Sequence, residues 1–489
     1  MSNVSTACRA AAEVRADDRS LPMSAAREVL VIGAGLTGLA TAYALTRRGV
    51  HVRVVEAGDR VGGVIGSCSR DGALYELGPN SALASTPLID ALLDRLAIRD
   101  RRIDASAAAR QRFIVRNGVP VAMPRSPLTF LRTPAFSLRA KLRLLREPFI
   151  GPAPAAEDES IAAFVRRRLG AEFVDRALDP FVAGIYAGDP ETISVRAAFP
   201  RLHALEQRSG SLLKGLLDAR RTRDPGEAPT ASRTSFSFDH GMQVLPQALA
   251  AALPDVMLAT HAERITVERD GTYSVLLRHA GGTRSLRAHG VVCAVPAAVA
   301  ATLLAAIDAA APAVAALRQV RYAPVASVAS LYRRADVTHA LDGFGFLVPR
   351  IERRRILGTI FSSSMFAGRA PAGHVLLTTF TGGCRDPEML SRNDADLGAI
   401  VAAELAALLG AHGRPVWQTI TRWPEAIPQY SLGHLDRMQT VSAVEAQLPG
   451  LFLAANYRGG VAIGDCIASA EAVAERVDEH LDRTTCASG

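Results

Sequence analysis

The feature that most constrains this chain is a glycine pattern between a short apolar strand and an apolar helix. Residues 28–32 (EVLVI) predict a buried strand, and residues 36–48 predict the helix that follows it. Gly33, Gly35 and Gly38 form the pattern GxGxxG at this junction. The first glycine permits a tight turn, the second lets the backbone approach a diphosphate, and the third lets the helix pack on the strand. The free N–H groups of the helix N-terminus would then face the phosphates.

A carboxylate stands where this unit needs one for a ribose. Residues 51–56 predict a second strand, and Glu56 closes it about 20 residues after Gly33, as the pattern requires. The carboxylate can accept hydrogen bonds from ribose hydroxyls, whereas it would repel the 2′-phosphate of NADP. The β-α-β unit therefore predicts a dinucleotide site and opens a parallel sheet.

Length and composition set wider limits. At 489 residues the chain is too long for one hydrophobic core, so we expect two or three modules. The charged fraction of 21% is ordinary for a globular protein, and the net charge of +8 is mild for this length. That excess suits anionic substrates or a membrane surface at least as well as nucleic acid, and no nucleic-acid-binding motif is visible, so we expect no nucleic-acid partner.

The cysteines and the beginning of the chain predict neither a metal site nor secretion. The six cysteines are far apart and form no CxxC pair, so we expect reduced thiols and no metal. Residues 1–25 lack a long apolar run and predict a disordered leader, or an upstream start before Met23. The longest uncharged apolar stretch, residues 291–307, is interrupted by Pro296 and predicts a strand followed by a helix, so no membrane span is expected.

A second glycine turn near the C-terminal end complements the first. Gly459 and Gly460 separate a predicted strand from a predicted helix, and Asp465 follows at the start of that helix. Backbone N–H groups of such a turn can lie beside a flavin, and the carboxylate can accept a hydrogen bond from the ribityl chain. Residues 59–63 (DRVGG) resemble the arginine-and-double-glycine extension of FAD-dependent amine oxidases. Together these segments favour FAD over NAD.

Ordered sequence blocks along the chain match one enzyme family. They are GAGLTGLATAYAL, EAGDRVGGVIGS, ELGPNS, RFIVRNGVPVAMP, PFVAGIYAGDP, SFDHGMQVLPQAL, FGFLVP, AIPQYSLGH and NYRGGVAIGDC. On these blocks, from about residue 28 to 480, the chain resembles the oxygen-dependent protoporphyrinogen/coproporphyrinogen oxidases. The resemblance implies an α/β and α+β architecture with three parts. These are a discontinuous Rossmann-like FAD domain (26–105, 230–315 and 440–485), an inserted mixed-sheet substrate-binding domain (316–439) and a helical membrane-associating module (106–229).

The resemblance also implies an activity. It is the six-electron oxidation of protoporphyrinogen IX to protoporphyrin IX in haem biosynthesis, with molecular oxygen as acceptor and hydrogen peroxide as product. Hydride would leave a meso carbon for flavin N5, and tautomerisation within the macrocycle would bring further hydrogens to that position. The protein then has to position the substrate, tune the flavin and exclude water, so no catalytic acid or base is assigned. Relatives are often homodimers, and the expected location is cytoplasmic with peripheral membrane association.

The matching motifs assign substrate and cofactor contacts by position. Arg112 matches the arginine that pairs a propionate, because a guanidinium offers a carboxylate a bidentate partner. Leu347 and Ile360 match the aliphatic residues that sandwich a pyrrole ring, and Phe380 the residue that stacks on another ring. Gly184 and Gly345 are expected to line the same pocket.

The expected FAD contacts come from both glycine turns and from the loops between them. They are Gly33, Gly35, Leu36, Thr37, Gly38, Glu56, Ala57, Arg60, Gly62, Gly63, Val64, Gly78, Pro79, Asn80, Ser81, Ala262, Val461, Ala462, Ile463 and Asp465. One of them departs from the family pattern. Family members often carry arginine after Gly-Pro, whereas this chain has Asn80.

A basic and apolar segment predicts a surface for lipid. Between residues 129 and 149, arginines and Lys141 interleave with Leu and Phe, as in an amphipathic element that rests on anionic lipid. In this family that region belongs to the membrane-associating module. The alternative is an ordinary solvated helix face, and the sequence leaves both open.

Three other functions compete with protoporphyrinogen oxidation. Coproporphyrinogen III oxidation to coproporphyrin III differs only in the substrate's side groups, and the sequence does not place the charges that would decide between them. Another FAD-dependent amine-oxidase-type enzyme, acting on polyamines or carotenoids, would share the cofactor motifs but not PFVAGIYAGDP or AIPQYSLGH. A catalytically inactive porphyrin carrier would have no need for intact flavin motifs at both ends of the chain.

Overall fold

A parallel sheet at one end of the molecule gathers strands from the beginning, middle and end of the chain. The computed structural model describes residues 28–154, 157–221 and 234–487, and the expected leader at residues 1–25 lies outside them. The sheet has the strand order β10-β2-β1-β14-β20, and every neighbouring pair is parallel. Its strands are β1 (Glu28–Ile32), β2 (His51–Val55), β10 (Val256–Met257), β14 (Gly290–Cys293) and β20 (Leu451–Leu453). This arrangement confirms the Rossmann-like sheet.

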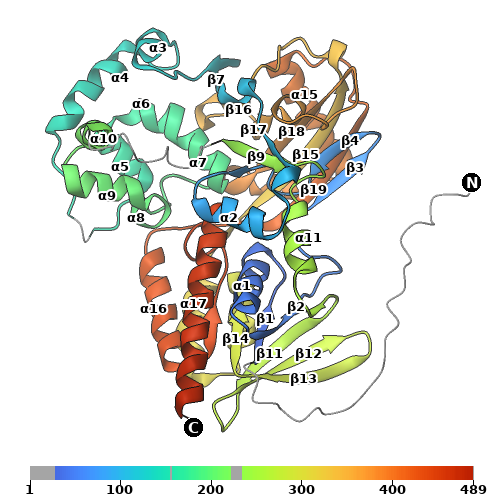
Figure 1. Ribbon diagram of the computed structural model, residues 1–489. Helices are drawn as coiled ribbons and strands as arrows, with labels where there is room; N and C mark the ends of the chain where they lie inside the picture. The colour runs from blue at the N-terminus through green and yellow to red at the C-terminus, as the bar shows by residue number, and fades with distance from the viewer. Residues whose placement is uncertain (1–27, 155–156, 222–233, 488–489) are drawn as a thin grey trace, which may run out of the picture.

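Helices cover one face of the parallel sheet and bury a continuous apolar cluster against it. The long helix α17 packs beside α1, so the C-terminal segment lies against the first glycine turn (Figure 1). Because both helices are apolar on the side that meets the sheet, the hydrophobic effect holds the two chain ends together. The helices on this face are α1 (Leu36–Arg47), α2 (Pro87–Arg95), α11 (Val244–Ala251) and α17 (Ile463–Ala487).

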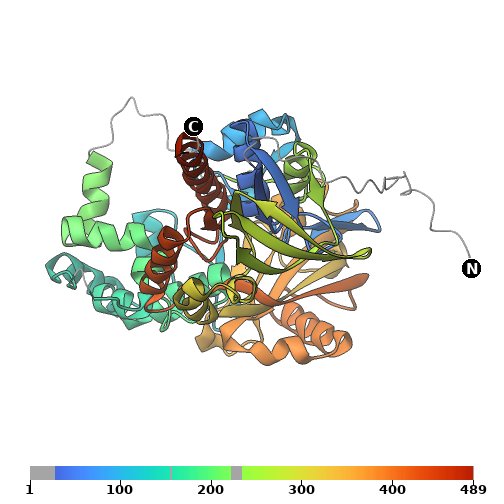
Figure 2. The ribbon, with the colours of Figure 1, turned by 90° about the horizontal axis from the view of Figure 1, so that it is seen from below.

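The other face of the parallel sheet is covered by a three-stranded antiparallel sheet and three helices. A second apolar cluster lies between these layers. The covering elements are β11 (His261–Val267), β12 (Tyr273–His279), β13 (Gly282–Ala288), α12 (Ala297–Leu304), α13 (Ala311–Arg318) and α16 (His434–Gln447). Seen from below, the helices between residues 127 and 221 lie to the left, and the strands of the large mixed sheet lie to the right (Figure 2).

A seven-stranded mixed sheet forms the second part, in the order β19-β15-β18-β17-β16-β7-β8. Its strands are β7 (Phe113–Arg116), β8 (Val119–Ala122), β15 (Tyr322–Arg333), β16 (Gly345–Leu347), β17 (Ile356–Ile360), β18 (His374–Gly382) and β19 (Trp417–Pro428). Helix α15 (Asp394–Leu409) packs on one face and buries an apolar cluster there. β7 and β8 lie in the range that was assigned to the helical module, residues 106–229. That assignment was wrong for them, because β7 pairs with β16.

Small sheets connect the two large ones. β3 (Ser67–Arg70) and β4 (Ala73–Glu76) form a hairpin, and β5 (Ala82–Leu83) and β6 (Arg102–Asp104) both pair with β9 (Ser235–Phe238). These strands come from the segments before and after the helical part. Their pairing joins the segment that precedes the helical part to the segment that follows it.

The third part is helical and has its own apolar core. Its helices are α3 (Pro127–Arg132), α4 (Leu138–Arg143), α5 (Ile161–Arg168), α6 (Ala171–Phe173), α7 (Asp179–Tyr186), α8 (Val195–Ala198), α9 (Pro200–Ser209) and α10 (Leu212–Arg221). Arg168 is fully buried and pairs with Glu147 and Glu206, which ties α5 to its neighbours. Within the described ranges, no helix combines the length and apolar character that a membrane crossing requires.

Candidate active site

The first glycine turn leaves open space where a diphosphate would approach. A Cβ at Gly33 would lie 2.7 Å from the carbonyl oxygen of Ala294, and one at Gly38 would overlap the carbonyl oxygen of Gly33. These two positions therefore admit only glycine, because strand and helix meet there. Gly35 differs: apart from its own neighbours along the chain, no atom lies within 4 Å of its Cβ position, and no side chain caps the helix at this residue. The uncapped N–H groups of α1 face this space, as an anion site requires.

Glu56 is held rigidly at the end of β2. Its Oε2 accepts from the N–H of Ala34 at 2.7 Å, and its Oε1 accepts from the N–H of Gly58 at 2.8 Å. Each carboxylate oxygen keeps a further lone pair that a ribose hydroxyl could use. The backbone of Glu56 also bonds to Met257 and Thr260, which holds the segment leading into β11, two residues before Ala262, against the end of β2.

The arginine and double-glycine segment forms a loop against the first turn. The guanidinium of Arg60 donates to the carbonyls of Ile65 (2.8 Å) and Gly63 (2.7 Å), so this side chain pins its own loop. The N–H of Gly62 donates to the Ala34 carbonyl at 2.8 Å, and a Cβ at Gly63 would lie 3.4 Å from the Cα of Gly35.

A third backbone segment reaches this loop from the β4–β5 connection. Gly78 approaches the Val64 carbonyl so closely that a Cβ there would overlap it. Pro79, Asn80 and Ser81 continue the same connection and are half-buried. The segments around residues 35, 62–64 and 78–81 are therefore adjacent, as the cofactor assignment requires.

The second glycine turn opens α17 beside α1. Gly459 and Gly460 both have positive φ (84° and 126°), a conformation that favours glycine. A Cβ at Gly460 would overlap the carboxylate of Asp465, and the N–H of Ala462 donates to that carboxylate at 3.3 Å. Burial raises the pKa of Asp465, while the Ala462 N–H opposes this rise.

Together these segments fit an extended dinucleotide. A helix N-terminus with open space at Gly35 suits a diphosphate, and Glu56 suits a ribose. The turn at residues 459–465 lies at the same end of the α1–α17 contact as the first glycine turn, since Cys466 interacts with Thr37 and Arg48 pairs with Glu471. The residues present thus fit FAD, although their individual contacts stay predictions.

The expected substrate residues lie on one face of the seven-stranded sheet. Phe346 and Phe113 pair in register and point into the cluster under α15. Because side chains alternate along a strand, the neighbours Leu347 and Arg112 point to the opposite face. Ile360 pairs with Gly345, and Phe380 pairs with Gly358, which places both side chains on that face as well. We call this face, away from α15, the substrate face.

Arg112 reaches the substrate face next to an aromatic ring. Its guanidinium carbon lies 4.9 Å from the centroid of Phe344, and the residue is exposed. Gly345 has a φ of 140°, and a Cβ there would overlap the Thr359 carbonyl. This glycine lets β16 and β17 approach closely, so its role at the site is backbone geometry.

Helix α7 stands opposite the substrate face. A Cβ at Gly184 would lie 2.9 Å from Cδ2 of Leu347, so the two predicted residues do meet. Phe181 and Ile185 flank Gly184 on the same side of the helix and are 43% and 38% exposed. Neither residue was predicted from the sequence. The sequence did hold a signal for them: two large apolar residues stand four positions apart, and Gly184, which was assigned to the pocket, lies between them.

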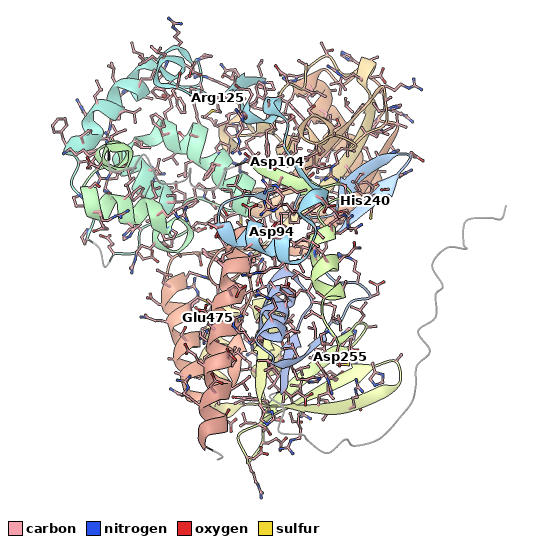
Figure 3. The ribbon with its side chains drawn as sticks, in the orientation of Figure 1. Asp94, Asp104, Arg125, His240, Asp255 and Glu475 are labelled. Atoms are coloured by element: carbon pink, nitrogen blue, oxygen red, sulfur yellow. The ribbon has the colours of Figure 1, made fainter. Side chains whose placement is uncertain are left out.

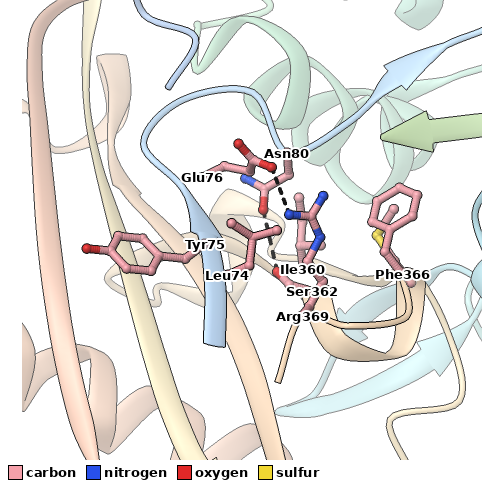
Figure 4. Close-up of a pocket in the computed structure, with 9 residues that line it drawn as sticks. Leu74, Tyr75, Glu76, Asn80, Ile360, Ser362, Phe366 and Arg369 are labelled. Atoms are coloured by element: carbon pink, nitrogen blue, oxygen red, sulfur yellow. Dashed lines mark hydrogen bonds and ion pairs between the residues drawn. The ribbon is translucent and has the colours of Figure 1, made fainter. Parts of the chain in front are cut away.

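A small pocket lies where the substrate face meets the predicted flavin loop. It is lined by Leu74, Tyr75, Glu76, Asn80, Ile360, Ser362, Met365, Phe366 and Arg369 (Figure 4). Ile360 was assigned to the substrate and Asn80 to the cofactor. Ser362 Oγ donates to Asn80 Oδ1 at 3.4 Å and bonds to Thr378 Oγ1 at 2.8 Å. This chain of hydrogen bonds connects the seven-stranded sheet to the loop after Gly78.

A buried ion pair supports the same pocket. Arg369 and Glu76 are both almost fully buried, with Nη1 and Oε1 3.1 Å apart. Glu76 also accepts from Ser67 and from the N–H of Met242 (3.0 Å). Burial raises the pKa of Glu76 and lowers that of Arg369, and each partner opposes the shift of the other. This pair was not predicted from the sequence, because its members are far apart in the chain.

Comparisons with known proteins agree on one family. The model of the flavin containing amine oxidoreductases matches residues 36–478. Protoporphyrinogen oxidase 2 of Arabidopsis thaliana is 32% identical over 95% of this chain and 96% of its own length. Coproporphyrinogen III oxidase of Bacillus subtilis is 28% identical over 90% of this chain and 96% of its own length. A candidate protoporphyrinogen oxidase from Exiguobacterium superposes with a TM-score of 0.77 at 26% identity, covering 93% of this chain and 99% of its own.

Proposed function

Because the chain belongs to the protoporphyrinogen/coproporphyrinogen oxidase family of the flavin-containing amine oxidoreductases, we propose that it oxidises protoporphyrinogen IX to protoporphyrin IX. Molecular oxygen is the acceptor and hydrogen peroxide the second product. The observation that carries the proposal is the substrate face. Arg112, Leu347, Ile360 and Phe380 converge there beside the predicted flavin loop.

The character of the substrate face favours protoporphyrinogen over coproporphyrinogen. Leu347, Ile360 and Phe380, with Phe181 and Ile185 opposite, offer aliphatic and aromatic contacts to a macrocycle. Among the residues assigned to this face, Arg112 supplies the positive charge. Coproporphyrinogen III carries two more propionates, and each would need a partner or lose its hydration. Coproporphyrinogen III oxidation remains the second candidate, because a relative of that name matches nearly the whole chain.

The protein's contribution to this reaction is geometric. FAD, when bound, accepts hydride from the substrate and passes electron pairs to dioxygen. Loss of six electrons from one porphyrinogen reduces three dioxygen molecules to hydrogen peroxide. The substrate face would support the macrocycle, and Arg112 would hold one propionate, so that one edge meets the flavin. Apolar walls also exclude water from the reacting carbon.

The direct test uses the purified full chain. We expect a flavin absorbance spectrum, and porphyrin fluorescence that rises under air with protoporphyrinogen IX faster than with coproporphyrinogen III. A faster rate with coproporphyrinogen III would reverse the preference. A flavin that is not bleached by either porphyrinogen without oxygen would reject porphyrinogen oxidation altogether and favour a carrier.

Replacing Arg112 by leucine should weaken substrate binding. A charged hydrogen-bond partner contributes roughly 1.5–3 kcal/mol, so we expect kcat/KM to fall about 10- to 100-fold, mainly through KM. Arg112→Lys should recover part of this loss, because the charge stays but the bidentate geometry does not. Arg110→Leu is the matched control, an exposed arginine two residues away. Equal effects at both positions would show that only the net charge matters.

We propose that the segment between residues 129 and 149, together with the preceding Arg125 and Leu128, binds an anionic membrane surface. Large apolar side chains there are more than half exposed, and arginines interleave with them at the end of the molecule where Figure 3 labels Arg125, away from Asp255 and Glu475 of the parallel-sheet domain. The exposed apolar residues are Leu128, Leu131, Leu138, Leu142, Leu145 and Phe149. The exposed arginines are Arg125, Arg132, Arg139 and Arg146. This combination supports lipid contact, since cations attract anionic headgroups and apolar side chains enter the acyl boundary.

Vesicle sedimentation tests the membrane proposal. The protein should bind phosphatidylserine vesicles at low salt and bind less at high salt. A Leu145→Ser/Phe149→Ser double variant should bind at least about 100-fold more weakly, because each buried side chain contributes about 1.5–3 kcal/mol. Ile351→Ser, which changes an exposed apolar residue elsewhere, is the control. No binding of the unaltered protein at low salt would reject the proposal.

Assembly and location stay predictions from the family resemblance. A homodimer would be seen by light scattering coupled to size-exclusion chromatography. Cell fractionation would distinguish a cytoplasmic protein from one that is recovered with membranes, and a salt wash would show whether its attachment is peripheral.

A further inference from the structure

Tyr430 connects the second glycine turn to the rest of the molecule. Its hydroxyl donates to the carbonyl of Asn456 at 2.8 Å and accepts from the N–H of Gly460 at 2.8 Å. One side-chain oxygen thus bridges both ends of the loop that leads into α17. Because the residue is only 3% exposed, water cannot replace these bonds without opening the core.

The ring of Tyr430 is fixed from both sides. It stacks on His434 with centroids 4.2 Å apart and an angle of 13° between the planes, and Tyr186 lies 6.0 Å away. Nε2 of His434 lies 2.9 Å from the Tyr457 carbonyl, so the same stack touches the glycine turn a second time. Burial lowers the pKa of His434 to about 4, so the imidazole is neutral at ordinary pH.

The neighbouring residue connects to the wall of the substrate face. Nε2 of Gln429 donates to the carbonyl of Tyr186, the last residue of α7, at 2.8 Å. The backbone carbonyl of Tyr430 accepts from the N–H of Ser194 at 2.8 Å. Gln429 and Tyr430 therefore hold α7, which carries Gly184, and the glycine turn, which carries Asp465, at a set separation.

We infer that Tyr430 is a positioning residue that fixes the flavin-facing turn at residues 456–465 relative to the α7 wall of the substrate site. This inference rests on the proposed function for its chemical meaning, because the turn matters only if a flavin lies beside it. Gly460 has a φ of 126° and follows Gly459 with a φ of 84°, so the turn has no side-chain packing of its own at these positions. The Tyr430 hydroxyl supplies the side-chain contact that holds the turn in place. Such a constraint matters for catalysis, because a small displacement of reacting groups lowers the rate of the reaction by a large factor.

The test compares two tyrosine hydroxyls. Tyr430→Phe keeps the ring and removes only the bridge. Tyr273→Phe is the matched control, because Tyr273 is also buried and its hydroxyl donates to two backbone carbonyls, those of Leu448 and Pro449, at 3.0 Å. In protein freed of flavin, hydrogen exchange of the peptide covering residues 456–463 should accelerate at least tenfold in Tyr430→Phe and stay within twofold in Tyr273→Phe.

The flavin-loaded variants give the second measurement. Tyr430→Phe should shift the flavin absorbance and its reduction potential and lower kcat roughly tenfold with KM within twofold, whereas Tyr273→Phe should keep the spectrum and kcat of the unaltered protein. Equal exchange and equal spectra in both variants would overturn the inference. If the unaltered protein bound no flavin, the proposed function would fail, but the exchange measurement would still report whether Tyr430 orders the turn.

Discussion

Gly35→Asp should give a folded protein that purifies without flavin. The backbone at this position is compatible with any L residue (φ −68°, ψ 173°), and apart from neighbours along the chain no atom lies within 4 Å of the new Cβ. Aspartate is also a favoured helix N-cap, so the apoprotein should be as stable as the unaltered one or slightly more stable. The carboxylate would occupy the space meant for the diphosphate and repel it. We expect FAD affinity to fall at least about 100-fold, roughly 2.7 kcal/mol.

Absorbance near the flavin maximum and thermal unfolding of the apoprotein measure these two effects separately. Gly151→Asp is the charge control, because it adds the same carboxylate at an exposed loop position with open space. A Gly38→Ala variant provides the opposite case, since its Cβ would overlap Gly33 and should destabilise the fold itself. A Gly35→Asp protein that retained a full complement of FAD would show that the diphosphate binds elsewhere.

Arg369→Leu should cause the largest loss of stability of the variants considered. Arg369 and Glu76 are 3% exposed each, and removal of the guanidinium leaves a buried carboxylate without its counter-ion. Breaking such a pair costs about 3–5 kcal/mol. Arg278→Leu is the control, because its partner Glu263 is on the surface and such pairs contribute about 0–1 kcal/mol. The measurement is the free energy of unfolding in urea.

The pH dependence of the Arg369→Leu loss has a definite sign. The pKa of Glu76 is already raised by burial, and loss of Arg369 removes a charge that lowers it. When the pKa of a carboxyl is higher in the folded than in the unfolded protein, the group destabilises the fold at pH values above its unfolded pKa. At such pH values folding must either bury the charge or take up a proton. The loss should therefore be smaller at pH 5 than at pH 8. A loss that is equal at both pH values would show that Glu76 is not the group left unpaired.

The cofactor half of the site could be predicted from sequence because its signals are local. Gly33, Gly35 and Gly38 lie within six residues, and their spacing alone implies a strand, a turn and a helix. The structure confirms that β-α-β unit. The substrate residues came from motif resemblance, and the register of β16, β17 and β18 places them on one face.

What sequence could not supply were the contacts between distant segments. Glu76 meets Arg369, and Tyr430 meets Gly460, only because the fold returns the chain to the same place. Periodicity reports which side of an element is buried but not what covers it. The assignment of β7 and β8 to the helical module failed for the same reason, since short strands next to a helical segment reveal their partner β16 only in three dimensions.

The strand order of the parallel sheet has a consequence for synthesis. Its central strand β1 leaves the ribosome early, but β14 and the edge strand β20 follow only after residues 290 and 451. Contacts of such long sequence separation form late and slowly. The nascent chain must therefore leave one edge of β1 unpaired until β14 is made, and the face of α1 that contacts α17 uncovered until translation is almost complete. A protein cut short before Leu451 would lack both the edge strand β20 and α17. Its parallel-sheet domain would be incompletely folded, and chaperones and proteases would recognise it.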